Sequence, residues 1–97
     1  MFAIRFTPQA IQDLRMHTRR DRRWIMDQID SCLKDEPGRE TRNNKALRPN
    51  RLAERELRIG RFRVFYDVDM ERAVVKIEAI GHKRGNRFYV GGEEFRL

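Results

Sequence analysis

The stretch ELRIGRFRVFY, residues 56–66, decides the fold. Apolar and polar residues alternate on both sides of Gly60-Arg61, and this period of two indicates two strands joined by a tight turn. We therefore expect strands at residues 53–59 and 62–68. Alternation divides each strand into two faces, and the more apolar faces carry Arg55, Leu57 and Ile59 in the first strand and Phe62, Val64, Tyr66 and Val68 in the second.

A third alternating run follows this hairpin at residues 73–81, after a polar turn at residues 69–72. Its alternation predicts Val75, Ile77 and Ala79 on one face. Because the connections between the three runs are short, the strands should pair as an antiparallel meander.

The N-terminal part predicts one more strand and a first helix. Residues 2–6 alternate with a period of two, as a strand does. Thr7-Pro8 is typical of a helix start, because threonine caps a helix and proline suits its first turn. A helix is therefore expected at residues 8–17.

A second helix and a loop connect these elements to the meander. Asp21 can cap this helix, and Pro37-Gly38 can end it. Its apolar stripe consists of Ile25, Ile29 and Leu33. Residues 39–52 are polar and basic, and we expect a loop there, with a helical turn near Leu47.

These elements predict an α+β protein with the order β-α-α-β-β-β, in a single domain over residues 1–97. The N-terminal helical hairpin should pack on one face of a small antiparallel sheet. The other face should be partly open. We expect it to carry the charged residues Arg58, Arg63, Lys76 and Glu78.

The composition is basic and rich in arginine. The chain has 22 Lys+Arg against 15 Asp+Glu, a net charge of +7, and only four of the basic residues are lysines. Arginine binds phosphate through two parallel hydrogen bonds, so this bias favours a nucleic-acid partner, although an acidic protein partner or a GC-rich genome would also explain it. Cys32 is the only cysteine, so no internal disulfide can form, and no apolar run is long enough to span a membrane. We expect a soluble, cytoplasmic protein.

The candidate chemistry is RNA cleavage without a metal. No residues have the spacing of a metal site or of a phosphate-binding glycine loop, so we expect no cofactor. Such cleavage needs a base, a cation for the phosphorane and an acid for the leaving oxygen. Arg63 suits the cation, His82 can transfer protons near neutral pH, and Glu54 or Glu56 can act as the base. Tyr89 can stack on a nucleobase or donate a hydrogen bond.

Several of these residues also have a purely structural interpretation. Glu56 and Arg63 can form an ion pair across the hairpin. His82 follows a strand and can be a solvated turn residue. His17 is expected at the surface, at a helix end where the helix dipole favours it.

The order of these segments resembles the RelE/ParE toxin superfamily. The resemblance rests on FTPQA at residues 6–10, ELRIGRFRVFY at residues 56–66, IGHK at residues 80–83, and Tyr89. It implies a small antiparallel sheet with two N-terminal helices, as the periodicity also predicts. It further implies a toxin that is held inactive by a cognate antitoxin with an acidic or amphipathic segment.

RelE-type members of this superfamily cleave mRNA in the ribosomal A site without a metal. By resemblance, Arg63 corresponds to the phosphate-stabilising arginine, Lys83 to a second basic residue and Tyr89 to the late tyrosine. His82 resembles a histidine that some branches use as acid or base.

The sequence departs from RelE at the general base. Lysines occupy the positions of Glu54 and Glu56 in RelE, so Glu56 or His82 takes that role here, or cleavage is weak. The expected catalytic set consists of Arg63, Lys83, Tyr89, His82 and Glu56. The expected RNA-binding set consists of Arg58, Arg61, Arg84, Arg87 and Lys45.

Three functions remain open at this point. The catalytic set favours a ribosome-dependent mRNA endonuclease that blocks translation, with the antitoxin, the ribosome and mRNA as partners. The ParE branch shares the fold and poisons DNA gyrase instead. A plain RNA-binding module without toxicity is the third possibility.

Overall fold

The computed structural model describes residues 1–96 and shows an α+β fold built on one sheet. The centre of the sheet is the predicted meander, in which β3 (Arg55–Ile59), β4 (Phe62–Asp69) and β5 (Val74–Arg84) pair antiparallel in this order. Gly60 lies in the tight turn between β3 and β4. Its φ of 58° is a conformation that glycine adopts without strain.

Four shorter strands extend the sheet on both sides. β2 (Asn44–Ala46) pairs with β3, while β6 (Arg87–Val90) and β7 (Glu93–Phe95) continue the sheet beyond the last part of β5. β1 (Ala3–Phe6) pairs in parallel with the first part of β5, so one strand departs from the antiparallel pattern. The strand predicted at residues 2–6 is therefore confirmed.

The segment 39–52 differs from its expected form. It contains β2, because the backbone of this segment pairs with the free edge of β3. The expectation of a helical turn near Leu47 is wrong. The Leu47 N–H donates to the Glu54 carbonyl at 2.8 Å, and its side chain packs beside Phe65 on the sheet.

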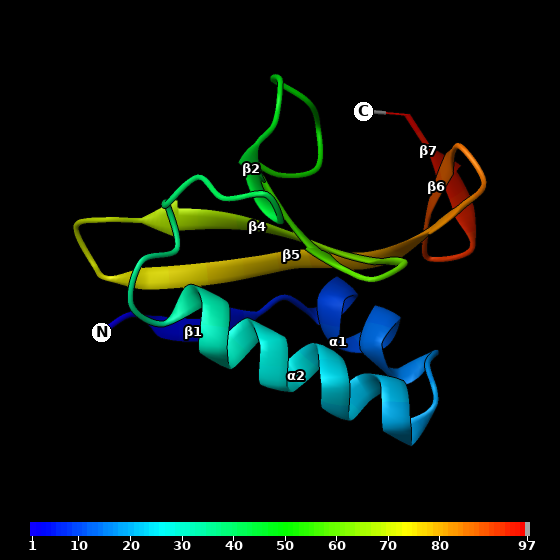
Figure 1. Cartoon of the computed structure of the whole chain (residues 1–97), viewed down its shortest axis with the longest axis horizontal. Helices are drawn as coiled ribbons and strands as arrows, with labels where there is room; N and C mark the ends of the chain where they lie inside the picture. Colours follow the sequence, from blue (N-terminus) through cyan, green and yellow to red (C-terminus); the bar gives the residue numbers. More distant parts are fainter. Residues whose placement is uncertain (97) are drawn as a thin grey trace.

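Two helices cover one face of the sheet (Figure 1). α1 (Pro8–Arg15) is capped by Thr7, whose side chain accepts a backbone hydrogen bond from the first turn, as the sequence predicts. α2 (Arg19–Leu33) is capped by Thr18 and not by Asp21, since the Thr18 hydroxyl accepts the Asp21 N–H at 3.2 Å. We call the face that the helices cover the helix face, and the opposite one the outer face.

Both helices end earlier than the sequence predicts. α1 ends at Arg15, before His17, because the chain turns there to start α2. α2 ends at Leu33, before Pro37, so this proline follows the helix without terminating it.

The main hydrophobic core lies between the helices and the sheet. It joins the predicted stripe of α2 to the inward side chains of β3, β4 and β5. Its buried members include Ile25, Ile29, Leu33, Leu57, Phe62, Val64 and Tyr66. A smaller cluster covers part of the outer face and leaves it partly open, as the sequence predicts, and consists of Ala53, Phe65 and Ala79 with Leu47, Leu52 and Val90.

A bulge in β5 reverses the direction of the side chains in its second half. The pairing with β4 skips Glu78, which is an extra residue in β5. Val75 and Ile77 belong to the core on the helix face, whereas Ala79 belongs to the outer cluster and Ile80 returns to the helix face. The predicted grouping of Ala79 with Val75 and Ile77 is therefore wrong.

The start of α1 fills a gap in the sheet beside this bulge. One part of β5 pairs with β1 and a later part pairs with β6, and no strand in the part of the chain that the structure describes pairs with residues 78–80 between them on that side. There, α1 and its capping residue Thr7 provide the hydrogen-bond partners instead. The Thr7 N–H donates to the Ile77 carbonyl at 3.0 Å, and the Thr7 hydroxyl donates to the Glu78 carbonyl at 2.9 Å. The buried carboxylate of Asp13 accepts the Ile80 N–H at 2.9 Å. These bonds fix α1 on the second half of β5.

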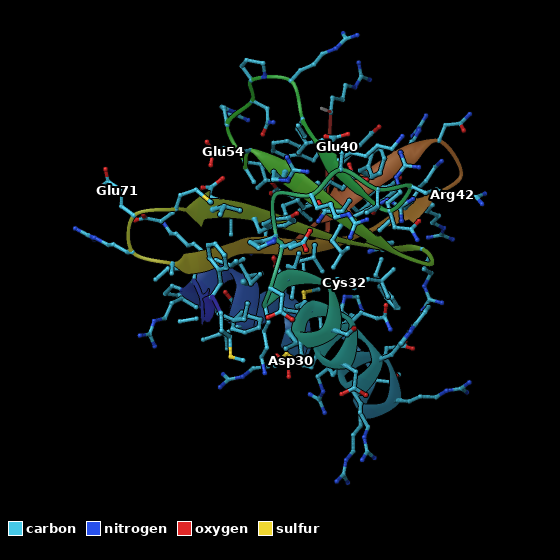
Figure 2. The ribbon with its side chains drawn as sticks, turned by 60° about the vertical axis from the view of Figure 1, so that its left-hand side comes forward. Asp30, Cys32, Glu40, Arg42, Glu54 and Glu71 are labelled. Carbon is cyan, nitrogen blue, oxygen red and sulfur yellow. The ribbon has the colours of Figure 1, made fainter. Side chains whose placement is uncertain are left out.

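The connections before β2 and β3 lie at one edge of the sheet, away from α2. Figure 2 shows Asp30 and Cys32 on α2, with Glu40 and Glu54 near the edge of the sheet that β2 and β3 form. Glu71 projects from the β4–β5 turn at one end of the sheet. Within residues 1–96, no helix combines the length and the apolar character needed to cross a membrane.

Candidate functional site

A carboxylate lies between two guanidinium groups on the outer face. Glu56 Oε1 is 3.2 Å from Arg58 Nε and 3.2 Å from Arg63 Nε. The side chains of Glu56 and Arg63 are each 7% exposed, whereas that of Arg58 is 47% exposed. The cross-strand ion pair that the alternation allows is therefore present and buried.

Arg63 also holds the β3–β4 turn. Its Nη1 donates to the Gly60 carbonyl at 2.7 Å and to the Phe62 carbonyl at 2.8 Å, and its guanidinium lies 5.8 Å from the centroid of the Phe88 ring. Its Nε is at ion-pair distance from the carboxylate but has no hydrogen-bond partner among the described residues, so that attraction is Coulombic. Burial lowers the pKa of the Arg63 guanidinium, and the neighbouring carboxylate opposes this shift.

Two predicted lysines complete the outer face. The register places Lys45 opposite Glu56 and Lys83 opposite Phe88, and both lysines are exposed. The outer face therefore combines a buried arginine with a rim of exposed cations, namely Lys45, Arg58 and Lys83.

His82 and Tyr89 lie on the helix face instead. They are partners on β5 and β6, and their rings stack with centroids 5.4 Å apart and an interplanar angle of 18°. The bulge at Glu78 causes this placement, because it turns His82 to the side of Phe62, its partner on β4. The predicted catalytic set is thus divided between the faces, with Arg63, Glu56 and Lys83 on the outer face and His82 and Tyr89 on the helix face.

His17 belongs with the second group, and nothing in the sequence pattern singles it out. It follows α1 and is half-buried rather than solvated, because the end of α1 packs onto the sheet. Its ring meets Phe62 edge-on at 4.9 Å and faces His82 at 6.4 Å, measured between ring centroids. Burial lowers the pKa of His17, and the charge on His82 lowers it further.

Three arginines lie near this group. Arg61, in the β3–β4 turn, has its guanidinium 4.6 Å from the centroid of Phe62 and 3.4 Å from the Asp21 carboxylate of α2. Arg84 and Arg87 are partners across β5 and β6 and are exposed, and Arg87 lies 3.7 Å from a glutamate of β7. Arg61 therefore contacts this group, while Arg84 and Arg87 lie further along the strands that carry His82 and Tyr89.

These side chains meet at one end of the molecule. The α1–α2 connection, the β3–β4 turn and β6 all lie at that end (Figure 1). We call the group formed by His17, Arg61, Phe62, His82 and Tyr89 the histidine site.

Comparison with known proteins identifies the family. The family model for the ParE toxin of the type II toxin–antitoxin system parDE matches residues 4–87. This chain belongs to the ParE toxin family. The toxin is also similar to a chain in the crystal structure of the toxin–antitoxin complex RelBE2 from Mycobacterium tuberculosis, with a TM-score of 0.73 and 28% sequence identity over 84% of the toxin and 98% of that chain. No curated protein matches the toxin.

These matches confirm the predicted RelE/ParE superfamily and the predicted α+β fold. The toxin is therefore the toxic component of a type II toxin–antitoxin system.

The predicted catalytic residues on the outer face and those in the histidine site differ in the chemistry that they can perform. Glu56 lies between two guanidinium groups, and its role as a base stays a prediction, whereas His82 lies beside the aromatic rings of Tyr89 and His17. Within residues 1–96, no cluster of three His, Cys, Asp or Glu side chains is placed to hold a metal ion.

Proposed function

We propose that the toxin is an endoribonuclease that cleaves ribosome-bound mRNA and thereby blocks translation. The observation that carries this proposal is the stacked pair of His82 and Tyr89 at an arginine-rich end of the sheet. His82 supplies an imidazole for proton transfer, and Tyr89 fixes the orientation of that ring. The exposed arginines beside them bind the phosphate backbone.

The outer-face residues have supporting roles in this proposal. Arg63 remains a candidate for stabilising the phosphorane, and its bonds to the β3–β4 turn support a second role, which is to position Arg61. Glu56 orients Arg63 and Arg58. Lys83 extends the cationic surface around the end of the sheet, where it can hold RNA beside the cleaved bond.

The direct test is incubation of the purified toxin with ribosomes and mRNA, followed by primer extension. We expect discrete new 5′ ends, and a cleavage rate that is about 10²–10⁴-fold lower for His82→Gln. The control variant is Glu71→Gln, at the β4–β5 turn (Figure 2). Intact mRNA in cells whose growth the toxin has arrested would overturn the proposal.

Inhibition of DNA gyrase is a second candidate function. The match to the ParE family model favours it, and so does the burial of Arg63, which limits contact with phosphate. Under this alternative, growth arrest would come with DNA damage and supercoiling defects while mRNA stays intact. His82→Gln would then leave growth arrest unchanged.

We also propose that the cognate antitoxin binds the toxin through an acidic or amphipathic segment. The net charge of +7 and the similarity to a toxin–antitoxin complex support this proposal. Coexpression of the adjacent short reading frame should restore growth. Failure of every adjacent frame to restore growth would contradict the proposal.

A further inference from the structure

We propose that His17 is a further catalytic residue of the toxin and forms an acid–base pair with His82 for cleavage of an RNA phosphodiester. This inference rests on the proposed ribonuclease function and deepens it. The two histidines are far apart in the sequence and come together because α1 packs on β5.

The geometry gives each imidazole a fixed place. His17 is held edge-on against Phe62 at 4.9 Å, and His82 is stacked on Tyr89 at 5.4 Å. The two imidazole rings are perpendicular, at 89°, with their centroids 6.4 Å apart. At this separation, one nitrogen of each ring can reach neighbouring oxygens of a single phosphodiester group.

The charges around His17 set its protonation state. The groups that face it are His82 of β5, Asp21 of α2, Arg61 of the β3–β4 turn and Asp13 of α1. Burial, His82 and Arg61 lower the pKa of His17, the two aspartates raise it, and the net effect is a lowering. The lowered pKa favours a neutral imidazole at His17, which is the form that a general base needs. This assigns the base to His17 and the acid to His82.

The proposed reaction is an internal transesterification. His17 takes the proton of the 2′-hydroxyl, and the 2′ oxygen attacks the adjacent phosphorus. The bond between phosphorus and the 5′ oxygen breaks with its electron pair on that oxygen, which takes a proton from His82. The products are a 2′,3′-cyclic phosphate and a 5′-hydroxyl, and exchange with solvent then removes the proton from His17 and returns one to His82. Arg61, whose side chain is 63% exposed, supplies positive charge for the phosphorane.

The competing explanation is that the two histidines only pack against aromatic neighbours. The variants must therefore separate packing from proton transfer. His17→Phe keeps a ring against Phe62 and removes the nitrogens, whereas His17→Gln removes the ring. Met16→Gln is the matched control, because Met16 is the adjacent residue and is 64% exposed.

The experiment measures single-turnover cleavage of ribosome-bound mRNA by the full-length toxin from about pH 5 to about pH 9. We expect a loss of about 10²-fold or more for His17→Phe, with an unchanged melting temperature, and full activity for Met16→Gln. His17→Gln should lose the limb of the pH profile that rises with pH, and His82→Gln the limb that falls. The cleaved ends should be a 2′,3′-cyclic phosphate and a 5′-hydroxyl.

Two results would overturn the acid–base pairing of His17 with His82 without overturning the proposed ribonuclease function. One is a folded His17→Phe variant whose rate is within about threefold of the unaltered toxin, and the other is a slower His17→Gln variant that keeps both limbs of the profile. The second result would mean that His17 has only a structural role. If the unaltered toxin leaves ribosome-bound mRNA intact, the proposed ribonuclease function fails, and the pairing fails with it.

Discussion

Arg63 occupies a position where a charged side chain is costly. Its side chain is 7% exposed, and removing a guanidinium from water costs several kcal/mol unless partners compensate. Glu56 and the carbonyls of Gly60 and Phe62 provide this compensation. We infer that the pair specifies the shape of the β3–β4 turn more than it adds to net stability, because buried ion pairs rarely exceed their desolvation cost by much.

Removing one member of this pair should strongly destabilise the toxin. Arg63→Met leaves Glu56 buried with Arg58 as its remaining ion-pair partner, and we expect the free energy of unfolding to fall by about 3 kcal/mol. Glu56→Leu should have a comparable effect. The double variant should lose less than the sum of the two single losses, since neither charge is then left unpaired. Urea denaturation of the four proteins measures this coupling, and additive losses would contradict it.

Glu78 should make the stability of the toxin depend on pH. Burial raises the pKa of Glu78 above its ordinary value of 4.5, and so does the hydrogen bond that the protonated Glu78 carboxyl donates to Asp67, while Lys76, at 3.3 Å, only partly opposes this. As the pH rises above 4.5, the unfolded chain releases this proton before the folded chain does, so stability falls until the raised pKa is passed. Below that window the carboxyl is protonated in both states and the penalty is absent.

Glu78→Gln tests this assignment. We expect the variant to be more stable than the unaltered toxin at about pH 7, and the difference to vanish below about pH 4. Thermal unfolding at both pH values measures the difference, with Glu71→Gln as the exposed control. A variant that is less stable at neutral pH would show that the ion pair with Lys76 outweighs burial.

At the scale of elements, one extra residue decides which side chains meet. Plain alternation along β5 puts Lys83 on the face of Val75 and Ile77, and His82 on the opposite face. The bulge at Glu78 exchanges them, so that His82 joins the helices and Lys83 the outer face. No residue pattern in the stretch predicts the bulge, which lies where Glu78 and Ile80 are hydrogen-bonded to Thr7 and Asp13, residues far away in the sequence.

How well the sequence predicts each element depends on how far apart in the sequence its interacting residues lie. The meander and the two helices have long apolar patterns, and these predictions are confirmed. The hairpins of β6 and β7 carry a weaker signal, the two-residue turns Gly85-Asn86 and Gly91-Gly92, in which all three glycines have positive φ. His17 has no such signal, since only the packing of α1 brings it to His82. A site assembled from separate elements is therefore the part that local pattern cannot predict.

Asp13 should be the residue that attaches α1 to the sheet. Asp13→Ala leaves the Ile80 N–H buried without an acceptor, and we expect a loss of about 1–3 kcal/mol in the free energy of unfolding. Asp13→Asn keeps a carbonyl acceptor and should recover part of that loss. Urea denaturation compares the two variants. Equal stability of Asp13→Ala and the unaltered toxin would show that Thr7 alone is sufficient.

Gly81 should be required for the pairing of β5 with β6. A Cβ at this position would lie 2.3 Å from the Tyr89 carbonyl oxygen, which is backbone and cannot rotate away. Gly81→Ala should therefore separate the strands and remove Tyr89 from His82, with a loss of both stability and cleavage. Gly38→Ala is the control, since its Cβ would meet nothing within 4 Å. Normal cleavage by Gly81→Ala would contradict the proposed importance of the stacked pair.

At the scale of the whole molecule, part of the charge is paired in ways that add little stability. Arg39 lies 3.7 Å from Glu36, and Arg72 lies 4.0 Å from Asp69, in exposed pairs. Such pairs each contribute under about 1 kcal/mol. The net charge of +7 is therefore better explained by attraction of a polyanion, either RNA or an acidic antitoxin segment, than by stability.

The salt dependence of RNA binding should show which face carries the phosphate backbone. If Arg61, Arg84 and Arg87 each neutralise one phosphate of single-stranded RNA, a plot of the logarithm of the binding constant against the logarithm of the salt concentration should have a slope of about −2. Arg84→Gln with Arg87→Gln should reduce the magnitude of this slope by roughly 1.4, because binding then releases fewer counterions from the RNA. The matched pair, Arg58→Gln with Lys83→Gln, removes the same charge from the outer face. If only that pair changes the slope, the backbone passes beside Arg63 and not over the histidine site.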